Sequence, residues 1–257
     1  MKANQAAFRW GRVAVADPAA FADATAAATV ASRSDTVVPT HLFTGSPLTG
    51  TVRESVERRA AQLLAHSGER AAASYVREVE TVWRRERAVT DSTELSEAVA
   101  DNLHRLTAYK DEYEVARMLT DKAFIQSVAA EVPGAGNLTY KLHPPVLRAM
   151  GRDRKIGFGP RSHIALRVLA KGKFLRGTRF DPFGRAEVRK VERRLLAHYR
   201  DLVAERLSDL TAEGYAATVD VARAPELVVG YEDVKLRNVD RYRARLSELG
   251  VDTTPIR

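Results

Sequence analysis

A tight turn followed by a long amphipathic stretch constrains the fold of this chain more than any other feature. Asp181-Pro182-Phe183-Gly184 places Asp, Pro and Gly at the positions that a type I turn prefers. After the turn, apolar residues recur with a helical period as far as Leu210 and form a single stripe, opposite a face rich in arginine. The pattern predicts one long helix with a buried apolar face.

Helical periods dominate the rest of the chain as well. The apolar stripe that follows Asp91 runs on to Val128, so this region is either one very long helix or a helix that breaks near Thr107 or Thr120. Asp91 and Glu94 have the spacing of a capping box. Residues 230–235 are expected to form a loop. Further helices are predicted at residues 51–66, 69–88, 161–171, 215–222 and 235–249.

These patterns predict a mainly α fold. We expect a helical domain over residues 51–257, preceded by an N-terminal arm and linker over residues 1–50, with ordered loops rich in Pro and Gly. The linker assignment rests on the Ser, Thr, Pro and Gly content of residues 32–51.

Composition excludes several classes of chemistry. The chain has 257 residues and no cysteine, so it contains no disulfide, no thiolate nucleophile and no cysteine-ligated zinc or iron–sulfur cluster. It shows no signal peptide and no apolar run near twenty residues, which predicts a cytoplasmic protein without membrane contact.

The positive charge is concentrated in one region. Residues 148–206 contain 17 Lys or Arg and 6 Asp or Glu, a net charge of +11, whereas the whole chain carries +8 and the remainder is therefore −3. Such a region suits an anionic partner, namely nucleic acid, a phosphate-bearing cofactor or an acidic protein. The alternative is a solvated helical face whose charges are partly paired.

No catalytic, cofactor-binding or metal-binding residue can be assigned from motifs. The 6 histidines are scattered without the spacing of a zinc helix, and there is neither a phosphate loop nor a nucleophile elbow. Gly134-Ala135-Gly136 lacks the preceding strand of a dinucleotide site. Asp111, Glu112 and Glu114 are interpreted as a solvated helical face. His143, which precedes two prolines, is interpreted as a structural residue in a rigid loop.

Five strings, taken together and in order, resemble the C-terminal region of the long, fused indolepyruvate ferredoxin oxidoreductases, members of the 2-oxoacid:ferredoxin oxidoreductase family. The match spans essentially the whole chain, and the order of several uncommon strings makes it fairly specific. The strings are AFRWGR at 7–12, AYKDEYEVARM at 108–118, KLHPPVL at 141–147, LRGTRFDPFGR at 175–185 and GYEDVKLRN at 230–238.

The resemblance implies an enzyme that oxidatively decarboxylates an arylpyruvate to an acyl-CoA and passes the electrons to ferredoxin. It implies thiamine diphosphate, iron–sulfur clusters and CoA, all bound by other regions, and no cofactor in this chain. The chain would then be a fragment or separate C-terminal module, not catalytic alone. Its expected partners are the catalytic domains or subunits and ferredoxin, and the full enzyme is expected to be oligomeric.

The sequence supports three hypotheses about function. Under the resemblance, the chain is an accessory module whose basic region faces the catalytic domains, CoA or ferredoxin. It could instead be a basic helical nucleic-acid-binding protein. It could also be a stand-alone enzyme with a pocket formed by the LHPP loop and the turn. The candidate interface or pocket residues are His143, Arg176, Arg179, Asp181, Arg194 and Lys235.

Overall fold

The computed structural model describes residues 2–22, 37–131, 139–142, 156–159, 162–230 and 232–256. The chain divides into two compact units, Met1–Asp35 and Thr36–Arg257, so the division falls within the predicted arm and linker. The first unit contains α1 (Lys2–Ala16). The rings of Trp10 and Phe21 meet edge to face there, with centroids 6.2 Å apart.

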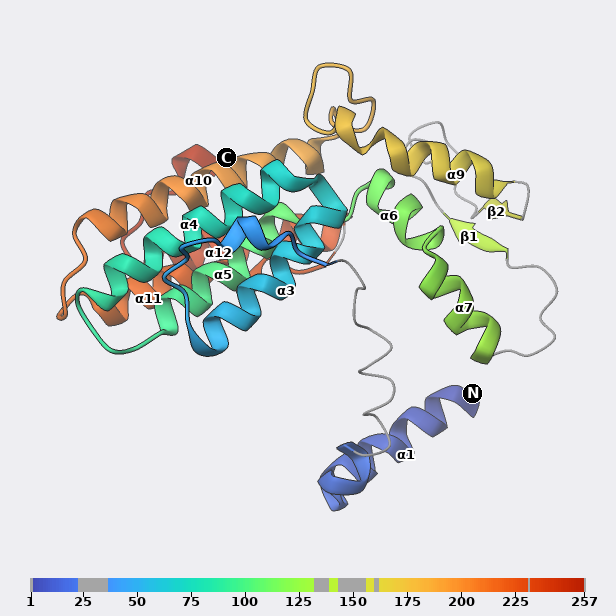
Figure 1. Cartoon of the computed structure of the whole chain (residues 1–257), viewed down its shortest axis with the longest axis horizontal. Helices are drawn as coiled ribbons and strands as arrows, with labels where there is room; N and C mark the ends of the chain where they lie inside the picture. The colour runs from blue at the N-terminus through green and yellow to red at the C-terminus, as the bar shows by residue number, and fades with distance from the viewer. Residues whose placement is uncertain are drawn as a thin grey trace. The chain divides into compact units, whose positions relative to one another are not determined.

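The core of the second unit is a bundle of amphipathic helices (Figure 1). Their apolar stripes meet in one cluster of buried residues, which includes the fully buried Leu63, Leu103 and Leu246. The mainly α fold that the sequence predicts is therefore confirmed. The bundle helices are α3 (Gly50–Ser67), α4 (Glu69–Arg87), α5 (Glu94–Thr107), α10 (Glu187–Ser208), α11 (Tyr215–Arg223) and α12 (Glu232–Glu248).

Polar groups inside the bundle satisfy helix ends and carbonyl groups. Glu86 of α4 is fully buried and accepts hydrogen bonds from the backbone N–H groups of Leu95 and Ser96 at 2.8 and 2.9 Å. It thereby caps the N-terminus of α5 from inside the core. The predicted capping box is wrong, because Asp91 pairs with Arg87 and the side chain of the N-cap residue, Thr93, makes no capping hydrogen bond.

The long apolar stripe breaks at both of the suggested points. The helix α5 ends at Thr107, α6 spans Glu112–Leu119, and α7 spans Lys122–Glu131. Beyond them, β1 (Tyr140–Leu142) and β2 (Ile156–Phe158) form an antiparallel pair in which Lys141 lies opposite Gly157. The helix α9 (Ser162–Lys171) packs against α6 and continues directly into the 3₁₀ turn η2 (Gly172–Leu175).

Residues 18–22 are also helical, and the chain has 3₁₀ turns at η1 (Thr40–Phe43), η3 (Ala224–Leu227) and η4 (Thr254–Ile256). The predicted loop at residues 230–235 is wrong in part, because α12 already begins at Glu232. Within the described residues, no helix has the length and apolarity that crossing a membrane requires.

Candidate functional site

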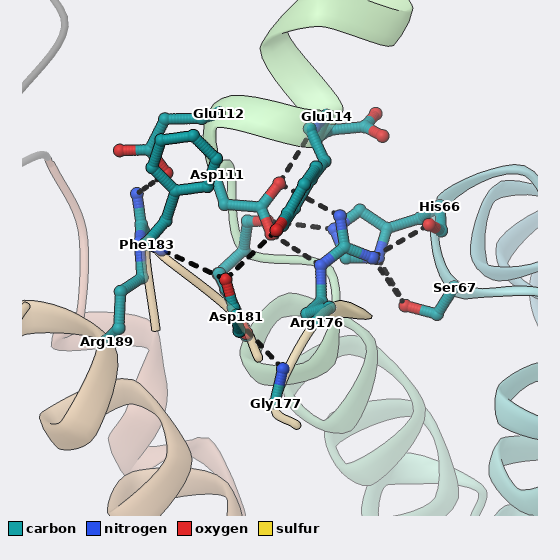
Figure 2. A network of polar contacts seen from close by, with 12 residues as sticks. His66, Ser67, Asp111, Glu112, Glu114, Arg176, Gly177, Asp181, Phe183 and Arg189 are labelled. Carbon is teal, nitrogen blue, oxygen red and sulfur yellow. Dashed lines mark hydrogen bonds and ion pairs between the residues drawn. The ribbon is translucent and has the colours of Figure 1, made fainter. Parts of the chain in front are cut away.

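Three of the five strings meet in a network of buried and partly buried polar side chains, here called the junction network. It lies where α6, the end of α3, the loop after η2 and the start of α10 come together (Figure 2). Its members are His66, Ser67, Asp111, Glu112, Tyr113, Arg176, Asp181, Arg189, Glu192 and Lys235.

Arg176 is the centre of this network. Its guanidinium group binds both carboxylate oxygens of Asp111, donating from Nη2 to Oδ1 at 2.9 Å and from Nε to Oδ2 at 2.5 Å. The third nitrogen, Nη1, donates to the carbonyl oxygen of His66 at 2.8 Å (Figure 2). Both side chains are buried, with exposed fractions of 10% for Arg176 and 3% for Asp111. A bidentate pair of this kind fixes the orientation of both groups.

Asp111 also begins α6. Its Oδ1 accepts the backbone N–H of Glu114 at 2.8 Å, which is the N-cap geometry that satisfies a free N–H of the first turn. Burial alone would raise the pKa of Asp111, but the hydrogen bonds and charge of Arg176, together with this N–H, hold the pKa below its ordinary value. The carboxylate is therefore a fixed anion.

His66 is held in one tautomer by its polar neighbours, Tyr109, Ser67 and Arg176. Its Nε2 lies 2.9 Å from the carbonyl oxygen of Tyr109, so this nitrogen carries the proton and donates. Its Nδ1 then accepts, and it faces Nη1 of Arg176 at 3.2 Å. Burial and the positive charge of Arg176 both lower the pKa of His66 below its ordinary value. The imidazole is therefore neutral and acts as a structural acceptor.

The same segment satisfies the carbonyl groups at the end of α3. Lys173 donates to the carbonyl oxygen of Ala65 at 2.6 Å, and Arg176 donates to that of His66. The N–H of Gly68, which has a φ of +90°, donates to Leu63 and Leu64. Cations at a helix C-terminus complement its partial negative charge, so α3 is joined to η2 and the following loop by charge as well as packing.

Asp181 organises the predicted turn. Its buried carboxylate accepts the N–H of Gly177 at 2.9 Å and the N–H of Phe183 at 3.1 Å. The hydroxyl of Tyr113 donates to it at 3.1 Å, and burial together with this carboxylate raises the pKa of Tyr113. Gly184 is required for close approach, because a Cβ there would lie 2.6 Å from the carboxylate.

Arg189 extends the network along α10 to the third string. Its Nη1 donates to Glu192 at 2.7 Å, and its Nη2 lies 3.7 Å from Oε2 of Glu112, within ion-pair range but beyond a hydrogen bond. Burial raises the pKa of Glu112 despite the nearby charge of Arg189. Lys235 of α12 donates to the other oxygen of Glu192 at 2.5 Å. The strings at 108–118, 175–185 and 230–238 are thereby connected.

The six candidate residues separate into three groups. Arg176, Asp181 and Lys235 belong to the junction network. Arg179 and Arg194 are exposed, and Arg179 lies over the ring of Phe180, 4.9 Å from its centroid. His143 and most of its KLHPPVL string lie outside the described residues.

The contacts of the network bear on what it can do chemically. Arg176 pairs with Asp111, whereas Asp181 binds Tyr113 and the backbone of Gly177. Because both side chains are occupied by different internal partners, they do not line a shared pocket, which counts against the hypothesis of a stand-alone enzyme. Among the residues that the structure describes, no three His, Asp or Glu side chains are arranged to hold a metal ion. The arrangement is that of a scaffold, in which fixed charges position backbone segments.

Sequence reasoning missed the role of several network members. The interpretation of Asp111, Glu112 and Glu114 as a solvated face is wrong, because Asp111 and Glu114 are buried and Glu112 is largely so. One signal was available, since Asp111 followed three residues later by Glu114 has the pattern of a helix start. No local pattern pointed to His66 or Glu192.

Most of the chain matches a protein family. The family described as "Family of unknown function (DUF6537)" matches residues 52–248. No curated protein matches the chain, and no solved structure does. The matched range covers the bundle from α3 to α12 and includes the whole junction network. The chain therefore belongs to the DUF6537 family.

Proposed function

We propose that the chain is the C-terminal accessory module of an indolepyruvate (2-oxoacid):ferredoxin oxidoreductase. The observation that carries the proposal is the junction network, which links side chains from three of the strings that resemble this enzyme. Unrelated strings that match by chance have no reason to meet in space. Their convergence on one buried network is what a shared structural module requires.

The contribution of the module is to position other parts of the enzyme. The network side chains bind one another and backbone groups, so they hold the loop at residues 176–186 and the start of α10 in place. Oxidative decarboxylation of the arylpyruvate, with thiamine diphosphate, CoA and iron–sulfur clusters, belongs to other domains of an oligomeric, cytoplasmic enzyme. The partners of this chain are those catalytic domains and ferredoxin.

Reconstitution tests this proposal. The thiamine and iron–sulfur portions of the enzyme are expressed separately and assayed for indolepyruvate- and CoA-dependent viologen reduction, with and without this chain. We expect no turnover from the chain alone and a clear requirement for it in the mixture. An equal amount of an unrelated basic protein is the control for non-specific stabilisation.

Two results would contradict the proposal. Turnover by the mixture that is indifferent to the chain would leave the resemblance without a functional meaning. Turnover by the chain alone would place the chemistry in this domain. An Arg176→Ala variant sharpens the positive outcome, because loss of the network should remove the stimulation, whereas Arg70→Ala, at an exposed position of α4, should retain it.

A further inference from the structure

One stretch of the sequence exposes positively charged side chains and contains no acidic residue between its two ends. No Asp or Glu occurs between Asp153 and Asp181, and Asp181 is itself buried. Within this stretch Arg167, Lys171 and Arg179 are exposed, and none has an ion-pair partner among the described residues. Their charge is therefore available to a partner, unlike that of Arg176, which is neutralised internally.

The same stretch exposes large apolar side chains. Phe174 of η2 is 76% exposed and Phe180 of the loop is 68% exposed. Ile164 and Val168, one helical turn apart on α9, are also exposed. Single exposed apolar residues are ordinary, but here two exposed phenylalanines and three cations without an ion-pair partner among the described residues all fall between Arg167 and Phe180 in the sequence. We call Arg167, Lys171, Phe174, Arg179 and Phe180 the basic–aromatic surface.

The junction network holds part of this surface in one conformation. Arg176 anchors the loop on one side of Arg179 and Phe180, and the carboxylate of Asp181 anchors it on the other. The tip between these anchors projects the two exposed side chains, with the guanidinium of Arg179 over the ring of Phe180. Side chains that are already ordered lose less conformational entropy on binding, so this is a favourable arrangement for recognition.

We propose that the basic–aromatic surface docks a small acidic electron-carrier protein. This inference rests on the proposed function, in which ferredoxin accepts the electrons. Charge complementarity selects the partner, since unpaired Lys and Arg attract a surface of carboxylates and accelerate encounter. The few side chains involved suit the small, transient interfaces of redox encounters better than the large interfaces of permanent subunits.

The composition of the surface favours a protein over a nucleic acid. Nucleic-acid interfaces are more polar and much more positively charged than protein interfaces. Here only three exposed cations lie in the stretch, and the exposed Ile164 and Val168 of α9 are aliphatic and offer a base nothing to stack on. Phe174 and Phe180 do offer ring faces, so binding of a single-stranded oligonucleotide is the competing outcome of the test. Protein–protein contacts commonly combine exposed apolar side chains with charged ones, as this stretch does.

Direct binding is the first test. The probe is a purified bacterial ferredoxin, titrated against the full chain at several salt concentrations. We expect binding that weakens as salt rises, and a Kd about tenfold higher for the triple variant R167E/K171E/R179E. A Phe174→Ser, Phe180→Ser variant should also bind more weakly. The triple variant R70E/R77E/R241E changes the net charge equally at exposed positions outside the surface and should bind like the wild type.

The reconstituted enzyme supplies a second readout. The R167E/K171E/R179E variant should raise KM for ferredoxin about tenfold with kcat unchanged, while viologen reduction, which needs no docking, stays at the wild-type rate. Equal KM values for this variant and the wild type would overturn the inference. So would binding of a 20-nucleotide DNA without binding of ferredoxin, or self-association of the chain that the variant abolishes.

These readouts separate the two proposals. If viologen turnover requires the chain but the surface variants leave ferredoxin binding and KM unchanged, the accessory role stands and the docking surface is wrong. If ferredoxin binds through the surface but turnover never requires the chain, the docking surface stands and the proposed role in turnover is wrong.

Discussion

In the helical bundle most of the fully buried side chains are leucine, valine and tyrosine, whereas in the junction network the buried side chains are mainly Arg, Asp and Glu. Apolar packing is non-directional and degrades gradually when a side chain is shortened. A buried ion pair depends on both partners, because removing one leaves an uncompensated charge in a dry environment. The two regions should therefore respond differently to substitution, pH and salt.

The largest expected effect is the loss of Arg176. Arg176→Ala leaves the buried carboxylate of Asp111 and the carbonyl of His66 without their donor, so it should lower the free energy of unfolding by about 3–5 kcal/mol. Urea denaturation followed by circular dichroism measures the loss. Arg179→Ala, three residues away and exposed, is the control and should change stability by at most about 0.5 kcal/mol.

A double-mutant cycle would sharpen this result. Asp111→Asn keeps an N-cap side chain, and Arg176→Met keeps an apolar stem, so the double variant removes both charges without leaving either alone. We expect its loss of stability to be smaller than the sum of the two single losses by at least about 1 kcal/mol. If the losses of stability in the two single variants add up to the loss in the double variant, the interaction between Asp111 and Arg176 contributes nothing to stability.

The next effect belongs to the bundle. Leu103→Ala of α5 removes a side chain that is 2% exposed, and it should cost about 2–5 kcal/mol through lost burial and the cavity that remains. Hydrogen exchange should place the damage in α4, α5 and α10, whereas Arg176→Ala should increase exchange in α6 and the loop at residues 176–186. Identical exchange maps for the two variants would contradict the division into two regions.

The same contrast explains which parts of the fold could be predicted. The bundle helices follow from a 3.6-residue period because each apolar stripe is local information. The junction does not, since Arg176 lies 65 residues from Asp111 in sequence and no periodicity specifies which cation a carboxylate meets. Glu86 is a similar case, because it caps α5 across the core while the local Asp91–Glu94 pattern does not.

The candidate site was predictable to a similar extent. Pro182 and Gly184 predicted a turn at residues 181–184; the chain bends at residues 182–183, but the backbone hydrogen bonds of this region close at Thr178–Asp181 and Phe183–Ala186. Arg176, Asp181 and Lys235 were candidate interface or pocket residues, and all three belong to the junction network. Their burial was not visible, because charged residues at helical spacing are usually solvated. The sequence does not distinguish a buried arginine, such as Arg176, from an exposed one, such as Arg179.

A smaller, pH-dependent effect should come from His104, a partly buried histidine of α5. Burial and the charge of Arg59 lower the pKa of His104 to about 4. The unfolded chain, with an ordinary pKa of 6.5, then binds a proton that the folded chain does not, so stability should fall as pH decreases from 6.5 to about 4. His104→Gln should flatten this part of the profile. If stability still falls with decreasing pH in the His104→Gln variant, another titratable group causes the pH dependence.

The smallest expected effect distinguishes two neighbouring carboxylates of the junction network. Burial raises the pKa of Glu112, so the folded chain binds the proton more readily than the unfolded chain and stability contributed by this group falls as pH rises above 4.5. The pKa of Asp111 is lowered, so its contribution is present above pH 3.8 and is lost below it. Near neutral pH, Glu112→Gln should therefore raise the free energy of unfolding slightly, by less than about 1 kcal/mol. The carboxylate of Glu112 is a largely buried charge, and its Oε2 accepts no hydrogen bond, so replacing it by a neutral amide removes the cost of burying that charge. Asp111→Asn, the same change one residue earlier, should be clearly destabilising. Equal losses from both substitutions would mean that the ion pair of Glu112 with Arg189, at 3.7 Å, outweighs the burial of its charge.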